Sequence, residues 1–167
     1  MRLTKKNIAS YLTDMGLLNT DALINGDFIV SHFQSRNSIF KITRNNNNGL
    51  FIKQLLEMDQ RNIYLMQKDA TVHYMMHKLN IYKQIKEHMA QYFGYDSISH
   101  VLITNYFQDS KNLIEWITNN KKLSIAHAHD IAEILSVFHK DISKKIPSTP
   151  SLQFFNKELP WILNLQN

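Results

Sequence analysis

Residues 27–54 read DFIVSHFQSRNSIFKITRNNNNGLFIKQ, and this stretch decides the fold. Three apolar or alternating runs are separated by two polar connections, which is the pattern of short strands joined by tight turns. The second connection, Asn45 to Gly49, is rich in residues that accept the positive φ of hairpin turns. The third run, Leu50 to Ile52, is followed directly by Lys53. We therefore expect three consecutive strands, with a lysine near the end of the third.

A lysine after a bulky strand is ordinarily a solvated residue, because fully buried lysines are rare. The neighbouring sequence favours a second interpretation. The runs SRN at 35–37, FKI at 40–42 and GLFIKQ at 49–54 resemble the start of bacterial phosphotransferases of the aminoglycoside phosphotransferase-like group, which share the protein-kinase-like fold. In that group the lysine of the third strand meets the α- and β-phosphates of the nucleotide, and an acid on the next helix pairs with it. The resemblance gives the first role to Lys53.

The helix after this lysine is expected over residues 62–80, and residues 67–74 read QKDATVHY. This run is similar to R-E-A-x-V-Y of the same family, which places Asp69 at the acidic position. Aspartate is one methylene shorter than glutamate, so we expect a longer or water-bridged pair with Lys53. Glu57 is a second possible partner from the preceding loop. The methionines of the helix are expected to fill the core.

Two further segments carry the resemblance. Gln34 to Asn37 would form the turn over the phosphates, where Ser35, Arg36 and Asn37 offer backbone, amide and guanidinium donors; an ordinary hairpin turn is the alternative. Residues 100–107, HVLITNYF, look like the strand leading into the family's adenine-binding hinge. The hinge residues, which would use backbone groups, are Asn105, Tyr106 and Phe107.

The remaining expectations concern the cofactors and the binding of the nucleotide base. ATP and Mg²⁺ are implied as cofactors, and the phosphoryl acceptor would be a small-molecule hydroxyl. Ile29, Ile52 and Ile103 could pack against both faces of the nucleotide base. Isoleucines of an ordinary hydrophobic core would give the same sequence pattern. Residues 131–139, IAEILSVFH, resemble a family helix that ends L-A-x-L-H. The likeness extends from Leu3 to about Leu165.

Composition places this chain of 167 residues among ordinary globular proteins, with 44% hydrophobic and 20% charged residues. The formal charge of +5 is scattered, so we expect no nucleic-acid partner. The chain has no cysteine, which excludes disulfides and suits a reducing, cytoplasmic location. No apolar run approaches the roughly 20 residues of a membrane span, so no membrane partner is expected. The eight histidines form no HExxH arrangement and are interpreted as structural.

Along the rest of the chain, residues 3–18 are predicted to form an amphipathic helix capped by Thr4 and ended by Gly16. Strands are expected over 92–95 and 100–107, and a helix capped by Asp109 or Ser110 is expected to run to Asn119. Ser124 would cap a final helix with a core-facing stripe, and residues 147–151 are a proline-containing break. The stripe consists of Ile131, Ile134, Leu135, Phe138 and Ile142.

The predicted fold is therefore α+β: a kinase-like N-lobe of five antiparallel strands and one long helix, followed by the first helices of a helical C-lobe. Residues 1–107 would form the N-lobe with its hinge, and residues 108–167 a partial C-lobe. The sequence lacks the family's catalytic H-G-D-x-x-x-x-N segment, so this chain should not catalyse phosphoryl transfer alone.

Three interpretations follow from the missing catalytic segment. The chain is the nucleotide-binding part of a phosphotransferase whose catalytic half lies on a separate segment or chain; or it is a kinase-like module that binds a nucleotide or protein without turnover; or it is an interaction domain without a nucleotide. A split kinase predicts an exposed apolar surface between Ile131 and Leu165. A self-sufficient module predicts that this surface is covered or forms a homodimer. An interaction domain predicts no cleft beside Lys53.

Overall fold

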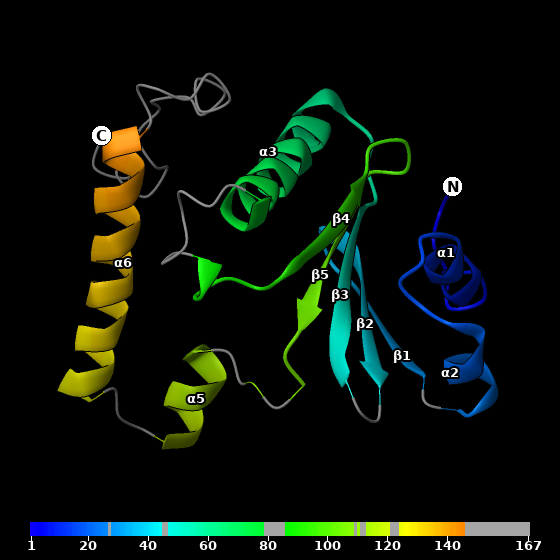
Figure 1. The fold of residues 1–167 in the computed structure, drawn as a ribbon, viewed down its shortest axis with the longest axis horizontal. Coiled ribbons are helices and arrows are strands. Elements are labelled where there is room, and N and C mark those ends of the chain that lie inside the picture. Colours follow the sequence, from blue (N-terminus) through cyan, green and yellow to red (C-terminus); the bar gives the residue numbers. More distant parts are fainter. Residues whose placement is uncertain are drawn as a thin grey trace.

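The computed structural model describes residues 1–26, 28–44, 47–78, 86–108, 110, 113–120 and 124–145. Within these ranges the chain has the predicted α+β fold, built on one five-stranded antiparallel sheet. The strand order is β1-β2-β3-β5-β4, so the lysine-bearing β3 lies at the centre (Figure 1). The strands are β1 (Ile29–Gln34), β2 (Asn37–Arg44), β3 (Asn47–Leu55), β4 (Tyr92–Asp96) and β5 (Val101–Tyr106). The helices are α1 (Ile8–Asp14), α2 (Thr20–Ile24), α3 (Gln60–Lys78), α5 (Leu113–Asn120) and α6 (Ile125–Lys145).

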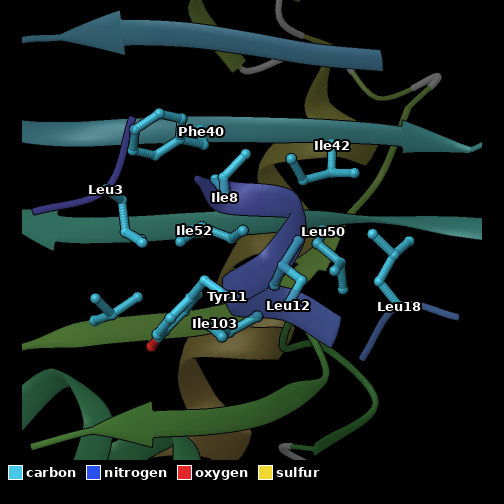
Figure 2. Close-up of a cluster of buried hydrophobic side chains, with 11 residues drawn as sticks. Leu3, Ile8, Tyr11, Leu12, Leu18, Phe40, Ile42, Leu50, Ile52 and Ile103 are labelled. Carbon is cyan, nitrogen blue, oxygen red and sulfur yellow. The ribbon is translucent and has the colours of Figure 1, made fainter. Parts of the chain in front are cut away.

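The main core lies between the sheet and the N-terminal segment that contains α1. Successive strand residues point to opposite faces, so every second residue of the three central strands points toward α1. Figure 2 shows α1 lying across these strands, with Ile8 and Leu12 directed at the sheet. The buried members of this core are Leu3, Ile8, Tyr11, Leu12, Leu18, Phe40, Ile42, Leu50, Ile52, Val101 and Ile103.

A smaller apolar cluster lies on the other face of the sheet, under α3. Met66 and Ala70 of the helix pack with Leu55 and Leu102 of the strands. Met66 is almost completely buried, as are the other helix methionines, Met75 and Met76, which confirms the expected core role of these residues. The sheet therefore carries a helix on each face, α1 on one side and α3 on the other (Figure 1).

The N-terminal helix is shorter than predicted. Thr4 does not cap it; Thr4 and Asn7 instead form a turn in which the Thr4 N–H donates to Asn7 Oδ1 at 2.7 Å and the Asn7 N–H donates to Thr4 Oγ1 at 3.3 Å. Helix α1 begins only after Asn7. Gly16 ends it as expected, with φ of 69°. The segment between Gly16 and β1 contains the short helix α2.

The C-terminal helices differ from the prediction in their exposure. Ser124 caps α6 as predicted, since its Oγ accepts the His127 N–H at 3.3 Å. The Ser110 N–H and hydroxyl both donate to the Phe107 carbonyl. Residues 111 and 112, which separate Ser110 from α5, lie outside the described residues, so the predicted cap at Ser110 stays a prediction. Asp109 and residues 146–167 lie outside the described residues.

The stripe on α6 was expected to face a core, and this was wrong for Ile131, Ile134 and Leu135, which are exposed. The periodicity of a helix identifies its apolar face but not the element that covers it. Helix α6 lies to one side of the sheet, beyond α3 (Figure 1). The side chains of Phe138 and Ile142 lie outside the described part.

Gln54 joins three segments of the α1 side of the fold. Its side chain is almost completely buried. Its Oε1 accepts the Leu3 N–H at 2.8 Å, and its Nε2 donates to the carbonyls of Met1 at 2.8 Å and Ser99 at 3.2 Å. One side chain thus ties the N-terminal segment and the β4–β5 turn to the central strand.

Substitution Gln54→Leu preserves side-chain size but leaves these buried backbone groups without their partner. We expect the free energy of unfolding to fall by about 2 kcal/mol or more, because each unsatisfied buried polar group costs about 1–3 kcal/mol. Urea unfolding followed by circular dichroism measures the change. The matched control is Gln91→Leu, since the Gln91 side chain is exposed. Equal stability of the two variants would contradict the bridging role.

Candidate functional site

Lys53 lies on the α3 face of β3, and the alternation of the strand puts it there. Its neighbours Ile52 and Gln54 point toward α1 and are buried. Lys53 pairs with Ile39 of β2 and Leu102 of β5 across the sheet. Residues directly opposite in an antiparallel sheet share a face, so all three side chains lie on the α3 side. The lysine side chain is 29% exposed.

The predicted pair between Lys53 and Asp69 is formed. Lys53 Nζ donates to Asp69 Oδ2 at 2.7 Å, which is a direct contact and not the longer or water-bridged one expected for aspartate. Asp69 lies on α3 and its side chain is 37% exposed. Glu57, the alternative partner, is exposed in the segment between β3 and α3. A strand lysine and a helix carboxylate are thus held together beside the sheet.

A cavity of about 100 Å³ adjoins Lys53, and we call it the Lys53 cavity. Arg36 and Asn37, which were expected in the turn before β2, line it together with Lys53. Asn62 of α3 adds a second amide, which sequence reasoning did not identify as a site residue. The rest of the lining is apolar and consists of Leu55, Leu65 and Met66.

The lining of the Lys53 cavity determines what it can hold. Two cationic side chains and two amides face it, and no carboxylate is among the residues that line it in the described part of the chain. Lysine and arginine are the side chains that bind phosphate oxygens, as a point charge and as a planar fork. The space exceeds that of a single water. The arrangement therefore suits a small oxyanion such as a phosphate group.

Ser35 belongs to the same β1–β2 turn but does not line the cavity. Its backbone N–H donates to the Asn37 carbonyl at 3.1 Å, which closes the turn. The turn is thus both a hairpin connection and one wall of the cavity. The hairpin uses the Ser35 N–H and the Asn37 carbonyl, and Arg36 and Asn37 also line the cavity.

The three predicted hinge residues lie at the end of β5 and after it, and they point in different directions. Asn105 is buried on the α1 side, and its N–H donates to the Gln91 carbonyl at 2.8 Å. Its Oδ1 is buried without a hydrogen-bond partner. Phe107 is exposed, and its carbonyl accepts the hydroxyl of Ser110 at 2.8 Å. Two of the backbone groups available to a base are thus already engaged within the chain.

Tyr106 lies on the same face of the sheet as Lys53. It pairs with Gly49, four residues before Lys53, so the two ends of this face are separated by roughly 13 Å along β3. Lys41 of β2 lies over the Tyr106 ring, with Nζ 4.9 Å from the centroid, and also 5.2 Å from the centroid of Phe33. Sequence analysis did not single out Lys41 or Phe33; the strand alternation that puts both on the Lys53 face was the available signal.

The three isoleucines proposed to hold a base do not form one site, although Ile52 and Ile103 pair directly across β3 and β5. Ile52 and Ile103 are completely buried against α1, on the face opposite Lys53. Ile29 is exposed on β1. A base on the Lys53 face would meet aromatic side chains such as Tyr106, because Ile52 and Ile103 fill the core on the opposite face.

His73 is a further titratable group at this site, one turn after Asp69 on α3. Its Nε2 lies 3.8 Å from Asp69 Oδ1, the carboxylate oxygen that Lys53 does not use. Burial lowers the pKa of His73, while the Asp69 carboxylate partly opposes this by raising it. The net direction is downward, so the folded protein favours the neutral imidazole. This preference stabilises the fold above the ordinary histidine pKa near 6.5 and is lost as the pH falls below it.

No group of three His, Asp or Glu side chains among the described residues is arranged to hold a metal ion. None of the helices in the same part of the chain combines the length and hydrophobicity needed to cross a bilayer. Comparisons with protein-family models, with curated proteins and with solved structures each find no match for this chain.

A double-mutant cycle on Lys53 and Asp69 tests the ion pair. We expect Lys53→Met and Asp69→Asn each to lower the free energy of unfolding by no more than about 1 kcal/mol, with a coupling energy of about 0.2–1 kcal/mol, because half-exposed pairs are screened by solvent. Urea unfolding of the two single variants and the double variant measures it. A coupling energy of zero would contradict this expectation and show that the contact adds nothing to stability.

Gly49 allows the Tyr106 ring and the β2 backbone to approach β3. A Cβ at Gly49 would lie 2.3 Å from the Ile42 carbonyl oxygen and 3.0 Å from Tyr106 Cδ1. We expect Gly49→Ala to lower the free energy of unfolding by about 1–3 kcal/mol, the usual cost of overpacking. The control is Gly94→Ala, where the nearest atom to the added Cβ is Met15 Cε at 3.7 Å, an ordinary contact. Thermal unfolding of both variants measures the difference in stability. Equal melting temperatures would contradict the close approach at Gly49.

Proposed function

We propose that this chain is the nucleotide-binding part of an ATP-dependent small-molecule phosphotransferase of the aminoglycoside phosphotransferase-like group. The observation that carries the proposal is the Lys53 cavity, in which Arg36, Asn37 and Lys53 meet beside the ion pair with Asp69. In protein kinases the strand lysine and the helix acid must pair before the phosphates are correctly held. The residues of this chain supply that pair and a cationic cavity adjoining it.

Each residue of the proposed site has a physical task. Asp69 restrains the flexible Lys53 side chain, so that the ammonium stays at the cavity. Lys53 and Arg36 neutralise phosphate charge, and Asn37 offers an amide donor. Tyr106 offers an aromatic ring to a base at the far end of the same face.

The residues around Lys53 do not suit the two implied cofactors, ATP and Mg²⁺, equally well. A nucleotide phosphate fits the Lys53 cavity, because the charged lining there is cationic. Mg²⁺ prefers carboxylate and phosphate oxygens. The carboxylate nearest Lys53, that of Asp69, is engaged with it, and the described residues contain no group of acidic side chains for a metal. In this proposal the chain binds the phosphates, and none of the roles given to its residues depends on the metal.

The catalytic groups would come from elsewhere in this proposal, from a separate chain or segment. Apolar side chains exposed on α5 and α6 are the surface that such a partner would cover, or that a homodimer would use; Ile114 is 77% exposed and Leu135 is 52% exposed. The phosphoryl acceptor would be bound mainly by that partner.

A second candidate function is a kinase-like module that binds a ligand or a protein without turnover. The hinge favours it, because the Asn105 N–H and the Phe107 carbonyl are engaged within the chain. A nucleotide held only through its phosphates would then bind without strong base selectivity.

The test is titration calorimetry of the folded chain with ATP and with pyrophosphate, each with and without Mg²⁺. We expect binding in the micromolar to millimolar range, and Lys53→Ala should weaken it about tenfold or more, since hydrogen bonds to charged groups contribute about 1.5–3 kcal/mol. The control is Lys6→Ala, which removes the same charge from an exposed position before α1, the helix on the opposite face of the sheet.

The outcomes separate the candidates. Binding of ATP and pyrophosphate alike supports a phosphate-only module, and stronger binding of ATP supports a base contact as well. Absence of binding by a folded chain, or equal affinity of Lys53→Ala and the parent, would overturn the proposal and leave the interaction domain.

A further inference from the structure

We propose that His73 is a positioning residue of the Lys53 cavity, which by taking up a proton shares the Asp69 carboxylate with Lys53 and so leaves more of the positive charge of the lysine for an anion. The inference rests on the proposed anion-binding role of Lys53, and it adds a regulation of that site by pH. It assigns a role to a half-buried titratable group that the proposed function does not use.

The geometry around Asp69 carries the inference. The carboxylate lies between two nitrogen groups and presents a different oxygen to each: Oδ2 to Lys53 Nζ at 2.7 Å and Oδ1 to His73 Nε2 at 3.8 Å. The second distance is too long for a hydrogen bond but short enough for strong attraction once the imidazole is charged. Asp69 is therefore in place to serve either cation.

The His73 ring is largely buried, which limits the groups that it can contact. Its side chain is 17% exposed, and its Nδ1 is buried without a hydrogen-bond partner. The ring stacks parallel to that of His77, with centroids 6.5 Å apart, and His77 is itself fixed by the Ala90 carbonyl, 2.8 Å from its Nε2. The imidazole is thus largely buried, with Nε2 toward Asp69.

The charged and titratable groups around His73 set the sign of the effect. Among described residues, Asp69 and His77 face it from α3, and Lys53 faces it from β3. The tyrosines of β4, Tyr92 and Tyr95, line a groove with Tyr74 on another side of α3. Of these neighbours only Asp69 is negative, so a proton gained by His73 is balanced by that carboxylate.

Protonation of His73 therefore has two consequences, and both raise the affinity of the cavity for an anion. The imidazolium draws on the Asp69 carboxylate, which then neutralises Lys53 less completely. It also adds a positive charge near the Lys53 cavity. Both changes favour a bound anion, so anion affinity rises as the pH falls through the His73 titration. By reciprocity, a bound anion must raise the pKa of His73.

The experiment measures pyrophosphate binding by calorimetry at about pH 7.5 and about pH 5.5, on either side of the ordinary histidine pKa near 6.5. Pyrophosphate changes its own charge in this range, so the informative quantity is the difference between variants. His73→Gln keeps a neutral amide near the position of Nε2 but cannot become charged. We expect the parent to gain about fivefold more affinity on acidification than His73→Gln, at the lower end of typical couplings between sites.

The matched control is His129→Gln. His129 also lies beside a carboxylate, with Nδ1 4.0 Å from Asp130 Oδ1, but both residues are exposed on α6. This variant should keep the pH dependence of the parent. If His73→Gln and the parent gain the same affinity on acidification, the proposed role of His73 is wrong.

A second measurement does not depend on the variant folding. NMR titration of the His73 ring in the parent protein, with and without saturating pyrophosphate, should show a higher pKa in the bound state, and an unchanged pKa would overturn the inference. Failure of pyrophosphate to bind at either pH would overturn the proposed function itself. Binding that depends on Lys53 but not on His73 would overturn only the inference.

Discussion

The alternation of β3 is the constraint on which the rest of this structure depends. Ile52 and Gln54 must point toward α1, because one fills the core and the other satisfies backbone groups of the N-terminal segment. Lys53 lies between them and so must point to the opposite face. A shift of one residue would bury the lysine and expose the core, so packing on one face determines the position of the charge on the other.

The two faces of the sheet consequently differ in their side chains and in what they contribute to stability. The α1 face is apolar and well filled, apart from polar residues such as Gln54, and supplies most of the burial (Figure 2). The α3 face has a smaller apolar cluster, and charged side chains remain half-exposed beside it. Half-exposed pairs such as Lys53–Asp69 contribute little to stability. The α3 face can therefore carry polar chemistry at small cost, because the opposite face stabilises the fold.

Local patterns predicted much of this fold. The strands were predictable because alternation and apolar runs are local in sequence, and the Lys53–Asp69 pair was expected from the resemblance. The turn predicted over Asn45 to Gly49 was too long, because β3 already begins at Asn47; Asn45 and Asn46 lie outside the described residues. The extent of α1 was not predictable, since Thr4 and Asn7 satisfy each other in a turn before the helix begins. Helical periodicity on α6 was also insufficient, because it cannot state what lies opposite Leu135.

The site itself was predictable only in part, for the same physical reason. The resemblance placed Arg36, Asn37 and Lys53 in one region, but Asn62 and His73 join it through the packing of α3, which no short pattern encodes. The alternation of β5 was likewise needed to see that Ile103 faces the core and Tyr106 faces the site.

The direct contact of Asp69 with Lys53 shows how helix packing changes a chemical expectation. An aspartate is one methylene shorter than a glutamate, so it reaches the lysine only if the helix lies close to the sheet. The next residue, Ala70, is buried against the sheet and has the smallest side chain of the cluster under α3. A small residue at the contact lets the helix backbone approach, since packing distances follow the side chains between elements. The small side chain of Ala70 thus offsets the short side chain of Asp69, and Asp69 contacts Lys53 at 2.7 Å.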